Sequence, residues 1–136
     1  MKRKYLFAAM LLSLLLAGCG GAAAVSDTIN VTMTDFQFQP NQFIVPAGQE
    51  ITFNSSNNGA VIHNFVVMQL GTTAGDTFDD EDVPNVYWEA EIPPGGSVNT
   101  SFTAPSEPGE YQVVCRTEGH IISGMIATLT VVAAEE

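Results

Sequence analysis

Residues 111–132 of the chain read YQVVCRTEGHIISGMIATLTVV. Tyr111 to Cys115 is a short run dominated by apolar residues, and Met125 to Val132 is rich in β-branched residues, so we expect a β-strand at each end. The nine residues between Cys115 and Met125 contain two glycines and favour a loop. The stretch therefore predicts a strand–loop–strand unit with scarce, chemically distinctive side chains in and beside its loop.

The rest of the chain shows short alternating or apolar runs separated by turn signals such as Asn57-Asn-Gly59 and Pro93-Pro-Gly-Gly96. The expected strands are 29–34, 42–45, 50–54, 62–69, 86–92, 98–104, 111–115 and 125–132. Residues 70–83 have no clear period, so we expect a loop or short helix inserted between strands. The pattern predicts an all-β fold, an antiparallel β-sandwich of Greek-key type with about eight strands, in one domain over residues 27–136.

The N-terminal segment has the pattern of an export signal. Three basic residues follow Met1, and Tyr5 to Ala17 is apolar apart from Ser13, too short a run to span a membrane. We therefore expect residues 1–18 to be a signal peptide.

Leu16-Ala-Gly-Cys19 resembles the bacterial lipobox, in which the cysteine is acylated and becomes the mature N-terminus. Residues 19–26 would then be a lipidated, flexible tether. We expect an exported protein that is lipid-anchored to a bacterial membrane and faces the periplasm or cell exterior. The alternative is an ordinary signal peptide cleaved nearby.

The charge balance of the chain excludes one class of partner. All 15 acidic residues lie beyond residue 26, where Arg116 is the only lysine or arginine, so this part carries a net charge of −14. Nucleic-acid binding needs a basic face and is not expected. The charge favours basic partners, or serves only solubility.

The scarce metal-ligating side chains fall into one pattern. His63 and His120 are the only histidines, and Cys115 is the only cysteine beyond the N-terminal segment. With Met125 they make up the ligand set of a blue-copper centre, in which two imidazoles and a thiolate bind the metal with a weak axial thioether. Taken singly, each could be an ordinary core residue. Four protein ligands leave no open position for a substrate, so we expect neither an enzyme nor a small-molecule substrate.

Several motifs resemble those of the cupredoxins, the small blue copper proteins that include plastocyanin, azurin and auracyanin. They are Phe43-Ile-Val-Pro-Ala-Gly48, His63-Asn-Phe-Val-Val67, Pro108-Gly-Glu-Tyr-Gln-Val-Val-Cys115, Gly119-His120, Gly124-Met125 and Thr128-Leu-Thr-Val131. The resemblance covers most of Val31 to Val132. The spacing Cys-x4-His-x4-Met looks most like that of the auracyanins, some of which are membrane-tethered.

The resemblance implies one copper ion bound by ring nitrogens of His63 and His120, the thiolate of Cys115 and, axially, Met125. It also implies that Asn64 lies beside the ligands, pins the ligand loop and donates to the cysteine sulfur.

Two positions depart from the family pattern. Arg116 replaces the usual Thr or Ser, so that Thr117 could become the partner of Asn64. Glu118 replaces a common proline.

The function expected is type-1 copper electron transfer, a one-electron shuttle between redox partners such as basic cytochromes or membrane complexes. Electrons would leave through His120, with Ile121 and Ile122 in a surrounding apolar patch unless they are core residues. The acidic run 76–82 could steer a partner or be merely solvated. Two alternatives stay open: a module that carries copper as cargo, and a metal-free structural lipoprotein.

Overall fold

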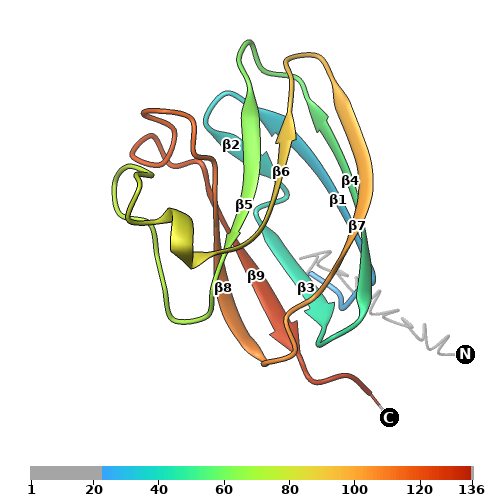
Figure 1. Ribbon diagram of the computed structural model, residues 1–136. Coiled ribbons are helices and arrows are strands. Elements are labelled where there is room, and N and C mark those ends of the chain that lie inside the picture. The colour runs from blue at the N-terminus through green and yellow to red at the C-terminus, as the bar shows by residue number, and fades with distance from the viewer. Residues whose placement is uncertain (1–22, 136) are drawn as a thin grey trace, which may run out of the picture.

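The computed structural model describes residues 23–135, so the predicted signal peptide and Cys19 lie outside the described residues. The described part contains nine strands and one short 3₁₀ helix (Figure 1). These are β1 (Thr28–Thr34), β2 (Gln37–Gln39), β3 (Gln42–Pro46), β4 (Glu50–Asn57), β5 (His63–Met68), η1 (Val83–Asn85), β6 (Val86–Ile92), β7 (Ser97–Thr103), β8 (Gly109–Val114) and β9 (Ile126–Val132).

The strands form two sheets, which confirms the predicted all-β sandwich. One sheet has the order β2-β1-β4-β7 and the other the order β3-β9-β8-β5-β6. The one strand that was not predicted is β2, which is only three residues long and pairs antiparallel with the end of β1. So short a run gives too little alternation to be recognised in the sequence.

Two strand pairings are parallel, so the sheets are mixed rather than purely antiparallel. β1 pairs with β4, and β3 pairs with β9, in the parallel direction. β3 belongs to the other sheet from β1, β2 and β4, so the chain crosses between the layers before and after it. Alternation of side chains specifies which face is buried but not the direction of the neighbouring strand.

The core between the sheets is aromatic at its centre. Phe65 of β5 packs against Phe38, Phe43 and Phe53, with ring centroids 4.9–5.6 Å apart. Trp88 stacks on Phe102 at 4.3 Å, which joins the edge strands β6 and β7 of the two sheets. Edge-to-face and offset contacts of this kind add to the stabilisation that apolar burial provides.

A second, smaller core lies on the outer face of β5 and β8. All six residues of β5 are buried, because the insertion between β5 and β6 covers the face that would otherwise meet solvent. This cluster contains Val66, Met68, Ala74, Val114 and Ile121, with Phe78 and Val86 packed against it. The insertion thus supports the loop between β8 and β9, beside which it lies in Figure 1.

The last two residues of the expected tether contact the sandwich. Val25, which the sequence places in a flexible tether, forms a parallel bridge with Ile44 of β3, and Ser26 N–H donates to the Ile44 carbonyl at 2.9 Å. In residues 23–135 the structure has no helix with the length and apolar character needed to cross a bilayer.

Candidate metal centre

The pairing of β5 with β8 brings His63 towards Cys115. Val66 pairs with Val114 in an antiparallel register, so the start of β5 lies beside the residues that follow β8. Cys115 is the first of these residues, and its sulfur accepts a hydrogen bond from the Asn64 N–H at 3.4 Å. Side chains 52 positions apart in the sequence therefore meet at one end of the sandwich.

The loop between β8 and β9 folds back to bring His120 to the same point. His120 N–H donates to the Thr117 carbonyl at 3.0 Å, and Met125 N–H donates to the His120 carbonyl at 2.9 Å. Gly119 and Gly124 have φ values of +78° and +96°, a backbone region that glycine adopts without steric cost. These turns fix the position of His120 relative to the two strands.

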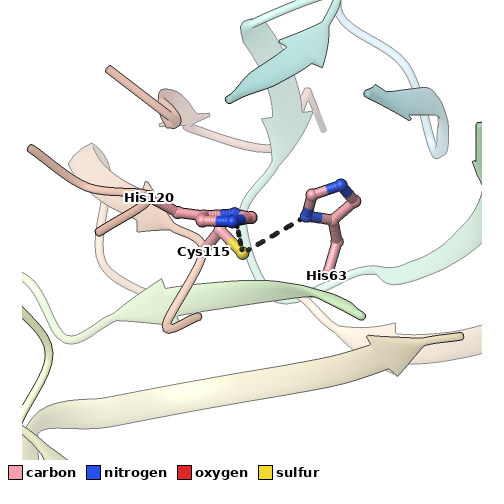
Figure 2. Close-up of side chains that lie close together, drawn as sticks. All are labelled: His63, Cys115 and His120. Carbon is pink, nitrogen blue, oxygen red and sulfur yellow. Dashed lines mark hydrogen bonds between the residues drawn. The ribbon is translucent and has the colours of Figure 1, made fainter. Parts of the chain in front are cut away.

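The sulfur and the two imidazoles converge in Figure 2. The Cys115 sulfur lies 3.5 Å from His120 Nδ1 and 3.7 Å from His63 Nδ1. The candidate donor atoms of the three residues all lie within 4.8 Å of one another. His63 and Cys115 are fully buried, and His120 is 5% exposed.

Met125 is also fully buried, and its backbone is hydrogen-bonded to those of His120 and Cys115. Its N–H bonds to His120 as described above, and its carbonyl accepts the Cys115 N–H at 3.3 Å. The structure therefore gathers His63, Cys115 and His120 by their side chains and places Met125 against them through its backbone.

Burial lowers the pKa of both histidines. For His63, desolvation is the largest cause and the neighbouring His120 adds to it, while Asp35 opposes the shift. For His120, desolvation again dominates, and Asp35 opposes it. Neutral imidazoles keep a free lone pair for a metal, and a thiolate with two imidazoles is a donor set that suits copper.

A family model described as a cupredoxin-like domain matches residues 6–128. The chain belongs to the cupredoxin family. The copper-resistant cuproprotein CopI of Rubrivivax gelatinosus is 28% identical over 122 residues, covering 82% of this chain and 70% of CopI. Plastocyanin of Hordeum vulgare is 32% identical over 121 residues, covering 82% of this chain and 66% of plastocyanin. The structure of auracyanin from Roseiflexus castenholzii matches with a TM-score of 0.67 at 28% identity, covering 80% of this cupredoxin and 99% of auracyanin.

The structure shows the surroundings of the two positions that depart from the family pattern. Thr117 Oγ1 donates to the Ile62 carbonyl at 2.8 Å and lies 3.5 Å from Asn64 Oδ1, so Thr117 links the ligand loop to the segment around His63. The Arg116 guanidinium turns outward and pairs with Glu89 at 3.0 Å. Glu118 is exposed.

Two residues that contact the histidines were not predicted from the sequence. Both lie in the turn between β1 and β2. Asp35 Oδ1 is 3.4 Å from His63 Nε2, and the Phe36 ring packs edge-on against His120, with centroids 5.1 Å apart. Phe36 has a φ of +68°, which is uncommon for a bulky residue. The only sequence signal in this region is the alternation of aromatic and polar residues in Phe36-Gln-Phe38-Gln39, which is typical of a short strand.

The two isoleucines after His120 have opposite environments. Ile121 is buried in the second core, whereas Ile122 is 68% exposed. Phe36, Val61 and Ile62 are also exposed, and they adjoin the histidines in sequence or by contact. We call the exposed set of Phe36, Val61, Ile62 and Ile122 the apolar rim.

Proposed function

We propose that this cupredoxin is a one-electron carrier with a type-1 copper centre held by His63, Cys115, His120 and Met125. The observation that carries the proposal is the convergence of both histidine Nδ1 atoms on the Cys115 sulfur in a buried site. A copper ion bound there would alternate between Cu(I) and Cu(II). The family membership and the similarity to plastocyanin and auracyanin support the same function.

The surroundings of the ligands suit electron transfer because they resist rearrangement. The Asn64 N–H donates to the Cys115 sulfur, and backbone hydrogen bonds in the ligand loop fix His120 and Met125. The second core packs against the loop between β8 and β9 through Ile121. A donor set that is fixed by the fold changes little when the charge of its metal changes, so little energy is spent on reorganisation. The four donors would leave no coordination position open for a substrate, which supports a carrier rather than an enzyme.

The apolar rim supports His120 as the point where electrons enter and leave. His120 keeps 5% exposure while His63 has none, and the residues of the apolar rim adjoin the two histidines in sequence or by contact. Exposed apolar groups rimmed by polar ones favour contact with another protein. With Arg116 as the single cation beyond the N-terminal segment, the net charge of −14 favours redox partners with basic surfaces, such as basic cytochromes.

Export and lipid anchoring are further parts of this proposal. They rest on the basic and apolar segment 1–18 and on Cys19 in its lipobox-like context. Mass spectrometry of the protein expressed with its own N-terminus would show a chain that begins at an acylated Cys19. A Cys19→Ser variant should appear in the soluble fraction, and an unmodified, uncleaved wild-type chain would contradict this part.

The test of the copper site is an optical and electron spin resonance spectrum of residues 23–136 with and without Cu(II). We expect an intense thiolate-to-copper band in the visible region and narrow hyperfine splitting. Cys115→Ser should abolish the band, because the charge-transfer donor is lost. Retention of the colour in this variant would exclude Cys115 as a ligand and overturn the assignment.

The second candidate is a module that stores or delivers copper, and the similarity to the copper-resistant cuproprotein CopI favours it. Metal delivery requires ligands that exchange, whereas the three gathered side chains are 0–5% exposed. Transfer of Cu(I) to a soluble chelator separates the two functions. A carrier should retain its copper over many electrochemical cycles, and loss of the metal within seconds would favour delivery.

A further inference from the structure

The turn between β1 and β2 brings a carboxylate to the outer nitrogen of His63. Asp35 Oδ1 lies 3.4 Å from Nε2, while Nδ1 faces the Cys115 sulfur, as the two ring nitrogens in Figure 2 show. His63 is fully buried, and its Nε2 has no hydrogen-bond partner of good geometry among the described residues. A buried nitrogen in this position calls for an acceptor, because an unpaired buried donor is costly.

We propose that Asp35 is a positioning residue for the metal centre, with its carboxylate accepting a hydrogen bond from His63 Nε2–H. The inference rests on the copper site proposed above. A neutral imidazole has one protonated nitrogen and one free lone pair, so a proton held on Nε2 leaves Nδ1 available as the ligand. Outer carboxylates and carbonyls hold metal-binding histidines in this way.

The backbone of the segment between β4 and β5 fixes the Asp35 carboxylate beside the His63 ring. Ala60 N–H donates to Asp35 Oδ1 at 3.1 Å. The same segment is tied to β1, because Asn58 N–H donates to the Met33 carbonyl at 2.8 Å. The segment between β4 and β5 therefore holds Asp35 and leads directly into His63.

Gly59 leaves the space in which the carboxylate and the ring approach each other. A Cβ atom at this position would collide with both Asp35 Oδ1 and His63 Nε2. The adjacent amide of Asn57 is not free to replace Asp35. Its Nδ2 donates to the carbonyls of Val61 and Ile92, and its Oδ1 accepts from Gly59 N–H.

The charge of Asp35 has a second consequence beyond orientation. A negative charge beside a ligand stabilises Cu(II) more than Cu(I), so it lowers the reduction potential. The side chain is 44% exposed, which weakens the effect by solvent screening but does not remove it. Two substitutions of Asp35 separate its effect on the orientation of the His63 ring from the effect of its charge on the reduction potential.

The experiment compares Asp35→Ala, Asp35→Asn and a control, Asp27→Asn, in the full-length protein. Asp27 is exposed and immediately precedes β1, at the opposite end of the strand, so the control removes the same charge far from the site. Asp35→Ala should weaken Cu(II) binding about 10–100-fold, the range for loss of an outer partner. Asp35→Asn keeps an acceptor and should bind more tightly than Asp35→Ala, but it should raise the reduction potential relative to Asp27→Asn. Equal affinities and potentials in all three variants would overturn the proposal.

A measurement on the metal-free protein tests the orientation separately. Nitrogen-15 NMR of wild type should show His63 as the Nε2–H tautomer, and Asp35→Ala should mix the tautomers. An unchanged tautomer in Asp35→Ala would overturn the proposal even if copper binds. Conversely, a wild-type protein without the visible copper band but with the tautomer change would overturn only the proposed function.

Discussion

Phe36 covers one side of the His120 ring, with the two ring centroids 5.1 Å apart and their planes at 66°. The contact requires Phe36 to adopt a left-handed backbone conformation, with φ at +68°. Such a conformation costs a residue with a Cβ about 1–2 kcal/mol. Strain of this kind beside a candidate ligand is typical of functional sites.

Because of this strain, we expect Phe36→Gly to be more stable than Phe36→Ala by about 1 kcal/mol. Both variants lose the ring, so the difference reports the backbone alone. Denaturant unfolding of the metal-free protein measures it. At Ile122, which has no positive φ and is exposed, the order should reverse. The same order at both positions would show that Phe36 is not strained.

Met125→Leu should retain copper and raise the reduction potential by at least about 59 mV, the value of a tenfold change for a one-electron couple. The reason is that leucine removes the axial thioether but fills nearly the same volume. Voltammetry gives the potential. Met33→Leu is the matched control, because Met33 is equally buried in the core between the sheets. An unchanged potential in Met125→Leu would show that Met125 is not axial.

Gly59→Ala should destabilise the protein by about 1–3 kcal/mol and weaken copper binding, because the added methyl group overpacks the contact between Asp35 and His63. Unfolding curves and a Cu(II) titration measure the two effects. Gly75→Ala is the control, since a Cβ at that glycine meets no atom within 4 Å. If the two variants behave alike, the space at Gly59 has no role in the site.

The metal-free protein should lose stability as the pH falls below about 6.5, the ordinary pKa of histidine. Burial lowers the pKa of His63 and His120, so below this value the unfolded chain binds more protons than the folded chain. Each histidine can contribute up to about 1.4 kcal/mol per pH unit. Unfolding at pH 7.0 and pH 5.5 measures the slope. It should be smaller in His120→Gln, and an equal slope there would contradict the prediction for this residue.

Much of the fold and of the candidate site can be predicted from the sequence, because both depend on local patterns. Alternation and turn residues indicated eight of the nine strands, and the missed strand, β2, is three residues long. The candidate ligands stand out because His63, His120 and Cys115 are scarce and chemically distinctive. The lowered pKa values of the histidines, by contrast, depend on burial, which no local pattern specifies.

The sequence by itself determined the sandwich and the set of candidate metal donors, because side-chain alternation and donor chemistry can be read from the residues one by one. Only the tertiary structure decided that Asp35 meets His63, that Phe36 covers His120, and that Ile121 is buried while Ile122 is exposed. The physical reason is that these contacts depend on strand direction, register and the path of turns. Strand direction, register and turn path are set by the packing of the whole chain, so they cannot be read from the few residues that make each contact.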